Sequence, residues 1–245
     1  MNQKFCHGNN MITIKNVSFS YNAKPILSNL TFAIKRGEHV AILGKSGCGK
    51  TTLVNILAGY LPLSTGSISI DGKSLSKPGR NRIVVSQEND LFDWLTVWQN
   101  MSIVSQDPVK IEYYLSLVDL ISAKDIYPTR LSGGMKKRLS LARALLVEPS
   151  FLILDEPFAS LDHKSRDAIQ VELSNVQQKT HKTILHITHN IDEAIYLSDR
   201  VILLGGSPAS ILREFSIDFT HPRRVAIKSS NKFEQYRNEI MSSYI

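Results

Sequence analysis

One eight-residue segment restricts the fold of this chain more than any other part of the sequence. It follows an apolar stretch, residues 39–43, and matches the pattern G-x-x-x-x-G-K-[ST] in full: Gly44-Lys45-Ser46-Gly47-Cys48-Gly49-Lys50-Thr51. Glycines here let backbone N–H groups approach phosphate oxygens, and the N-terminus of a following helix adds the positive end of its dipole. Lys50 would reach the β- and γ-phosphates, and Thr51 would offer its hydroxyl to Mg²⁺. Together with Thr52, the segment predicts a nucleoside triphosphate site; the alternative is a glycine turn without a ligand.

Two acidic residues end a second apolar stretch. Residues 151–154 are all apolar, and Asp155 and Glu156 follow directly. Carboxylates inside a buried strand would carry a large desolvation cost, so acids at its end are expected to face a site. Beside a phosphate-binding turn, Asp155 would hold Mg²⁺ and Glu156 would polarise the attacking water. The alternative is a carboxylate that caps the next helix, which explains one acid better than two.

Apolar strands alternate with amphipathic helices along most of the chain. We predict strands at residues 11–19, 31–34, 39–43, 67–70, 82–86, 151–154, 183–187 and 201–204. Helices are predicted at residues 50–61, 163–178, 192–197 and 232–241, with a helical insertion in residues 111–147. Apolar strands separated by helices indicate a parallel sheet covered on both faces. The predicted class is α/β: a P-loop NTPase with a mainly parallel sheet, an N-terminal antiparallel β part and an inserted helical subdomain.

The helical insertion carries a third motif, Leu131-Ser132-Gly133-Gly134-Met135. A Ser-Gly-Gly that opens a helix offers exposed N–H groups and a hydroxyl to an anion. In this order and spacing with the two segments above, it resembles the signature of ABC-type ATPases. The resemblance extends over nearly the whole chain from residue 11 onward. It divides the chain into a loose leader (1–10), the ATPase domain (11–220, with the helical subdomain at about 88–147) and a short tail with a helix (221–245).

The resemblance implies roles for further residues. Tyr21 matches the aromatic that stacks on adenine, Gln87 matches the glutamine that senses Mg²⁺ and the γ-phosphate, and His189 matches the histidine that contacts the γ-phosphate. The loop Ser160-Leu161-Asp162 matches one that crosses a dimer interface. Taken singly, Tyr21 could be a core aromatic, Gln87 a turn residue and His189 a strand-end histidine. The implied catalytic set is then completed by Glu156 and Lys50.

Membership in such a family would make one chain an incomplete enzyme. The resemblance implies that two copies sandwich two ATP molecules, so that Ser132, Gly133 and Gly134 of one copy face the phosphate turn of the other. Met135 stands where the family usually has glutamine. This methionine, together with residues 91–97 and 192–194, resembles the importer subgroup for nitrate, sulfonates and taurine. Such a subunit would work with a separate integral-membrane permease and, indirectly, with an extracytoplasmic solute-binding protein.

Composition and length exclude several other functions. No run approaches the roughly 18 apolar residues of a membrane span, and residues 88–130 are too few for the long coiled coil of DNA-repair relatives. The net charge is +7, but the basic residues do not form a stripe interleaved with aromatic residues. No nucleic-acid partner is therefore expected. We therefore expect a peripheral subunit at the cytoplasmic face of the membrane. The alternatives are a non-transport ABC ATPase or a regulatory module that holds ATP without turnover.

Overall fold

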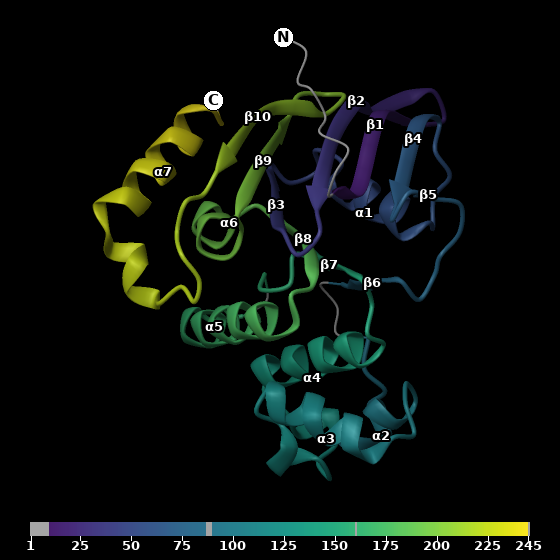
Figure 1. Ribbon diagram of the computed structural model, residues 1–245, viewed down its shortest axis with the longest axis vertical. Helices are drawn as coiled ribbons and strands as arrows, with labels where there is room; N and C mark the ends of the chain where they lie inside the picture. Colours follow the sequence, from purple (N-terminus) through teal and green to yellow (C-terminus); the bar gives the residue numbers. More distant parts are fainter. Residues whose placement is uncertain (1–9, 87–89, 160, 245) are drawn as a thin grey trace.

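The strands form two sheets in the computed structural model, which describes residues 10–86, 90–159 and 161–244 (Figure 1). The smaller sheet has the order β2-β1-β4-β5 and is antiparallel throughout. The larger sheet has the order β10-β9-β3-β8-β7-β6, and all of its pairs are parallel except β10 with β9. The predicted α/β class is confirmed, including the N-terminal antiparallel part.

The strands and helices have the following bounds. The strands are β1 (Asn10–Tyr21), β2 (Lys24–Lys35), β3 (His39–Gly44), β4 (Thr65–Ile70), β5 (Lys73–Ser74), β6 (Arg82–Val85), β7 (Phe151–Asp155), β8 (Thr183–Thr188), β9 (Arg200–Gly205) and β10 (Ser210–Ser216). The α-helices are α1 (Lys50–Ala58), α2 (Val97–Ser102), α3 (Pro108–Leu117), α4 (Gly133–Leu146), α5 (His163–Thr180), α6 (Ile191–Leu197) and α7 (Asn231–Ser242). Short 3-10 turns lie at Ile121–Ala123, Pro128–Arg130 and Val225–Ser229.

The central strand β3 shows why the strands of the larger sheet are mostly apolar. Side chains alternate between the two faces of a strand. Ala41 and Leu43 belong to a core shared with α4, α5, α6 and α7, whereas Val40 and Ile42 belong to a core shared with α1 and the smaller sheet. Both faces are covered, so no position of β3 can be polar without a partner.

Helix α1 lies between the two sheets. Its residues Leu53, Ile56 and Leu57 are fully buried in the same core as strands of both sheets. This packing fixes the start of α1 against the end of β3. The phosphate-binding turn that joins them is therefore anchored on both sides.

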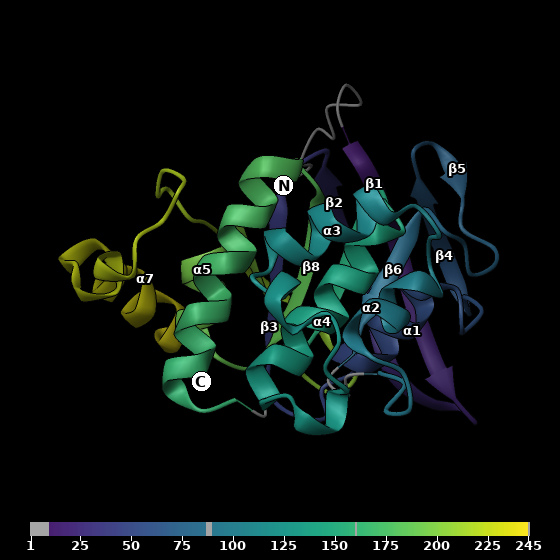
Figure 2. The same ribbon diagram turned by 90° about the horizontal axis from the view of Figure 1, so that it is seen from below.

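The helical part stands apart from the sheets, below them in the view of Figure 1. It consists of α2, α3, α4 and two 3-10 turns, and Leu115, Leu139 and Leu145 pack in its interior. Viewed from below, α4 and α5 lie side by side, and α7 lies beyond α5 (Figure 2). The predicted helical insertion is thus present within residues 97–146.

Buried Asn100 shapes the segment that leads into this helical part. Its amide nitrogen donates to the carbonyl oxygens of Phe92, Leu95 and Thr96, and its amide oxygen accepts from the N–H of Phe92. A buried amide whose hydrogen bonds all go to one short loop holds that loop in a single shape. Trp94, at its tip, remains 72% exposed.

Some observed elements differ from the prediction, and the short strand β5 and helix α2 were not predicted. The helix predicted over 50–61 ends at Ala58, because Gly59 adopts a left-handed conformation and its N–H returns to the carbonyls of Asn55 and Ile56. The strand predicted over 31–34 extends over the whole of β2. The edge strand β10 was not predicted; its exposed Arg213 and half-buried Glu214 interrupt the apolar pattern.

The C-terminal segment packs against helix α6. Arg223 is buried, and its Nη1 donates to the carbonyl oxygens of Ile195, Tyr196 and Ser198 at the end of α6. A cation at this place is favoured by the negative end of the helix dipole. Within the described residues, no helix combines the length and the apolar character needed to cross a membrane.

Candidate functional site

The phosphate-binding turn is built where β3 ends and α1 begins. Gly49 has a φ of +102°, a conformation that residues with a Cβ rarely adopt. A Cβ at Gly49 would also lie 2.9 Å from the Leu27 side chain. The turn therefore needs glycine at this position both for its backbone conformation and for the close approach of β2.

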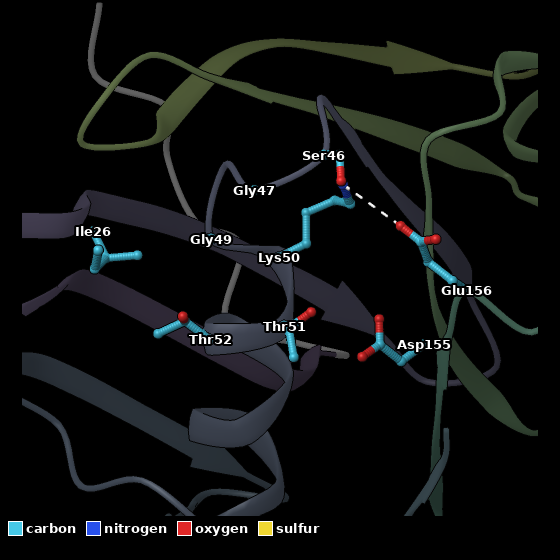
Figure 3. Close-up of a pocket in the computed structure, with 9 residues that line it drawn as sticks. All are labelled: Ile26, Ser46, Gly47, Gly49, Lys50, Thr51, Thr52, Asp155 and Glu156. Carbon is cyan, nitrogen blue, oxygen red and sulfur yellow. Dashed lines mark ion pairs between the residues drawn. The ribbon is translucent and has the colours of Figure 1, made fainter. Parts of the chain in front are cut away.

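An open pocket of about 350 Å³ lies against this turn. Its lining comes from the turn, the first turn of α1, the end of β7 and one residue of β2: Ile26, Ser46, Gly47, Gly49, Lys50, Thr51, Thr52, Asp155 and Glu156 (Figure 3). The volume is in the range of small-molecule sites. The two predicted motifs, more than a hundred residues apart in the sequence, thus face one space.

Lys50 is the buried cation of this pocket. It is 5% exposed, and its Nζ donates to the carbonyl oxygens of Gly44, at 2.8 Å, and Lys45, at 3.0 Å. The same Nζ lies 3.8 Å from Oε1 of Glu156. The ammonium is therefore held at the mouth of the turn, facing the acids (Figure 3).

Asp155 and Glu156 end β7 on the opposite side of the pocket. Burial raises the pKa of Asp155, and the neighbouring charge of Glu156 raises it further, while Lys50 and Lys137 oppose the shift. Glu156 has a φ of +44°, which is uncommon for a residue with a side chain, and its N–H donates to the carbonyl of Ile187. Strand β8 thereby holds Glu156 in a conformation that turns its carboxylate toward Lys50.

His189 joins this group from the adjacent strand. It follows β8, and its Nδ1 lies 3.2 Å from Oε2 of Glu156. Because β7 and β8 are parallel neighbours, their carboxyl ends place these two residues together. A small pocket of about 40 Å³ on this side is lined by Glu156, Ala159, Arg166, Thr188, His189, Asn190 and Glu193.

Other predicted site residues are not in this pocket. Ser132 and Gly133 are exposed at the start of α4, where the Ser132 hydroxyl accepts a hydrogen bond from the N–H of Met135. Neither they nor Gly134 line the pocket of Lys50. Tyr21 ends β1 and is 44% exposed, outside the pocket lining.

Two predictions fall on residues outside the described part of the chain. These are Gln87 and Ser160, so their predicted roles stay predictions.

Cys48 lies in the phosphate-binding turn and lines a second pocket, of about 300 Å³, on the other side of the turn together with Lys24 and Lys45.

Sequence reasoning missed Ile26, which lines both pockets of the turn. Its sequence signal is weak because it lies outside the strand predicted at residues 31–34. Pairing with distant segments brings it to the turn: β2 pairs with β1, and the carbonyl oxygen of Ile26 accepts from the N–H of Ala209 at 2.8 Å. An aliphatic side chain here gives the pocket one apolar wall.

The arrangement combines one buried cation, two carboxylates, backbone N–H groups of a helix start and a histidine. Such a set suits an anionic ligand at the turn and a water molecule beside Glu156. No group of three or more metal-ligating His, Cys, Asp or Glu side chains occurs in the described residues.

Comparison with known families and proteins places these features in context. The family model described as ABC transporter matches residues 27–159. An aliphatic sulfonates import ATP-binding protein of Bacillus thuringiensis is 37% identical, covering 89% of this chain and 88% of that protein. A nitrate import ATP-binding protein of Synechococcus elongatus is 36% identical, covering 88% of this chain and 83% of that protein.

Two solved structures share the fold. One is cbiO1 of Clostridium perfringens, part of the ABC transporter complex cbiONQ, with a TM-score of 0.80 and 26% identity over 96% of this chain and 99% of that chain. The other is a bacterial ABC transporter cassette solved as a dimer, with a TM-score of 0.73 and 27% identity over 86% of this chain and 100% of that chain.

Proposed function

The chain belongs to the ABC transporter family of ATP-hydrolysing proteins, and from this premise we propose that it powers the import of a small solute through a separate membrane permease. The observation that carries the proposal is the shared pocket of Lys50, Thr51, Asp155 and Glu156, where Lys50 and Glu156 approach to 3.8 Å. This pocket would bind the triphosphate of ATP and place a water molecule for attack.

The turn and Lys50 would hold the phosphates. The N–H groups at the start of α1 point toward an anion, and Lys50 would exchange its carbonyl partners for the β- and γ-phosphate oxygens. Gly44, Lys45, Ser46, Gly47, Cys48 and Gly49 form the backbone cradle, and Thr52 continues it into α1. Tyr21, at the edge of the smaller sheet, is proposed to stack on the adenine.

The residues of this pocket fit one Mg²⁺ ion. Thr51 offers a hydroxyl and Asp155 a carboxylate to the same pocket (Figure 3), and oxygen is the ligand that Mg²⁺ prefers. In nucleotide sites Mg²⁺ is usually bound by one or two carboxylates together with phosphate oxygens and water. Bound there, it would neutralise charge on the transferred phosphate. Gln87 is proposed as a further contact.

Glu156 would then polarise the attacking water, and His189 would contact the γ-phosphate. The 3.2 Å contact between His189 and Glu156 supports this assignment, because it shows that both side chains reach one point. Glu156 also keeps its carboxylate turned toward Lys50. A general base in such a position contributes roughly 10²–10⁴-fold to a rate.

A second copy of the chain would complete each site. Ser132 and Gly133 are exposed and lie outside the pocket, so their helix start is free to meet the ATP of a partner. The dimeric cassette that shares the fold supports this arrangement. ATP would hold the closed dimer together, and hydrolysis would release it.

The importer role rests on the sulfonate and nitrate import relatives. Their names refer to sulfonates and nitrate, and we propose a small anionic or sulfonate-, nitrate- or taurine-like solute for this chain. The permease would dock on the segment around exposed Trp94, at the cytoplasmic face of the membrane, with the chain bound peripherally. An extracytoplasmic solute-binding protein would deliver the solute.

The test of the ATP mechanism is Glu156→Gln. Turnover should fall by about 10²-fold or more, and the variant should elute as a dimer from a sizing column with MgATP and as a monomer without it. Glu148→Gln, a change in an exposed carboxylate that pairs with Lys110, is the matched control and should behave as the wild type. A Glu156→Gln protein that binds ATP and stays monomeric would contradict the dimer.

The test of the transport role is the native complex. Affinity capture of the chain from membranes, followed by mass spectrometry, should identify a permease and a solute-binding protein. Capture of DNA-repair or translation components in place of a permease would contradict transport.

A further inference from the structure

Glu193 is a buried carboxylate that the site described above does not use. It lies in the first turn of α6, four residues after His189, and is 6% exposed. A buried carboxylate costs free energy unless it is paired and hydrogen-bonded. Its partners therefore indicate what its position serves.

One oxygen of Glu193 holds the backbone on both sides of His189. The Thr188 hydroxyl donates to Oε2 of Glu193 at 2.7 Å, and the N–H of Asn190 donates to the Thr188 hydroxyl oxygen at 3.0 Å. The N–H of Glu193 in turn donates to the side-chain oxygen of Asn190 at 3.1 Å. His189 itself is exposed, so its place is set by these two fixed neighbours.

The other oxygen of Glu193 faces a cation from α5. Arg166 Nε lies 3.5 Å from Oε1 of Glu193, an ion pair beyond hydrogen-bond geometry, and Arg166 Nη2 donates to the carbonyl oxygen of Leu161 at 3.0 Å. Leu161 belongs to the loop between Glu156 and α5. One guanidinium thus joins that loop to the carboxylate that fixes Thr188 and Asn190.

We propose that Glu193 and Arg166 are positioning residues that couple the loop at Leu161 to His189. The proposal rests on the proposed contact of His189 with the γ-phosphate. A shift of Leu161 would draw Arg166 away from Glu193, and a buried carboxylate without its cation is costly. Glu193, Thr188 and His189 would therefore shift together with the loop.

The consequence for the reaction is geometric. Contact of a second copy with the loop at Leu161 would hold Arg166 against Glu193, and Glu193 would hold His189 at Glu156. The ring would stay near the attacking water only while the loop is in place. Neither Glu193 nor Arg166 needs to touch ATP for this effect.

The experiment compares Glu193→Gln and Arg166→Met with the matched control Asp192→Asn. Asp192 lies next to Glu193 in α6, but its carboxylate binds Arg237 on α7 and makes no contact with residues 188–190 among those described. We expect kcat to fall by about tenfold or more in the first two variants, with the KM for MgATP within about twofold of the wild type. Asp192→Asn should keep its kcat, and Arg166→Lys should recover part of the loss.

A double-mutant cycle separates positioning from a merely structural role. In a His189→Ala background, Glu193→Gln should cause little further loss of kcat, because the residue it positions is gone. An equal loss with and without His189 would overturn the proposal. So would a Glu193→Gln protein with unchanged kcat.

A measurement without turnover keeps this proposal distinct from the proposed function. The imidazole NMR signals of His189, in the wild type with a non-hydrolysable ATP analogue, should change in Glu193→Gln and stay in place in Asp192→Asn. Unchanged signals in Glu193→Gln would overturn the positioning role. Absence of ATP turnover in the wild type would instead contradict the proposed function. The NMR result would then decide the positioning role by itself.

Discussion

The Nζ atom of Lys137 on α4 donates a hydrogen bond of 2.7 Å to the backbone carbonyl oxygen of Ser86, the residue that follows β6. Lys137 is 4% exposed, and burial lowers its pKa to about 8, while the charges of Asp90 and Asp155 oppose the shift. The helix that begins with the Ser-Gly-Gly motif is therefore tied to the end of the sheet beside Asp155.

This buried ammonium makes stability depend on alkaline pH. The folded-state pKa of about 8 lies below the ordinary 10.5, so the unfolded chain binds more protons between these values and stability rises with pH there. We compare the free energy of unfolding of the wild type with that of Lys137→Met. The difference, wild type minus variant, should rise by about 3 kcal/mol from a pH of about 7 to about 10.5. Urea unfolding of both proteins measures it; a constant difference would show that Lys137 does not titrate in this range.

Two fully buried histidines predict a dependence of the same sign in acid, where stability again rises with pH. The rings of His39 and His186 lie 5.8 Å apart, and burial lowers the pKa of His39 to about 4 and that of His186 well below its ordinary value. Both histidines have a lowered pKa in the folded state. Their contribution to the free energy of unfolding is therefore fully present above a pH of about 6.5 and is lost as the pH drops toward about 4.

The variant His186→Leu isolates this effect. Neither ring nitrogen of His186 has a hydrogen-bond partner among the described residues, so leucine removes the titration without breaking a hydrogen bond. Between pH of about 6.5 and about 5, the wild type should lose about 1 kcal/mol per pH unit more than the variant. Parallel curves from urea unfolding would rule the histidine out as a source of acid sensitivity.

Alkylation of Cys48 should inhibit ATP turnover, and ATP should protect against it. The thiol is partly exposed in the phosphate turn, and a Cβ on Gly44 would lie 2.7 Å from its sulfur, so an added group would displace the turn. Labelling with iodoacetamide, quantified by mass spectrometry, is compared with the rate of phosphate release. Cys48→Ser controls for labelling at Cys6 and should stay active after treatment; full activity of quantitatively labelled wild type would contradict the prediction.

Trp94→Ala should weaken association with the permease. Trp94 is 72% exposed, packs edge-on against Phe92 at 5.3 Å, and stands on the loop that Asn100 holds. An exposed indole on a rigid loop is suited to a buried contact with a partner. The amount of permease recovered with the tagged chain from membranes should fall several-fold, whereas Tyr113→Ala, at an exposed aromatic on α3, should recover as much as the wild type. Equal recovery from both variants would place the docking surface elsewhere.

The parts of the site that could be predicted are those encoded in one stretch of chain. The phosphate turn and the acids after β7 are local patterns, and the parallel order of the strands brings them to one pocket. Ile26 and the contacts of Glu193 with Arg166 depend on pairing between distant segments, which no local pattern reports. The edge strand β10 was missed for a related reason. Its charged residues face water or pair with the neighbouring strand, so they interrupt the apolar pattern that predicts a strand.

The position of Tyr21 shows the same limit from another side. It ends β1, two residues beyond the strand predicted at residues 11–19. Its place relative to a bound adenine depends on a ligand and not on the chain alone. Its T-shaped contact with Phe19, at 4.8 Å between ring centroids, fixes one edge of the ring. The adenine role thus stays a prediction, unlike the fold.

The separation of Ser132 from the pocket of Lys50 also has a genetic consequence. In the proposed dimer, a cell with one normal gene and one that encodes Glu156→Gln would pair its chains at random, and most dimers would contain at least one defective copy. The defective allele is then expected to be dominant. Conversely, a chain changed at Lys50 and a chain changed at Ser132 would together assemble one intact site, so two inactive alleles would partly complement each other.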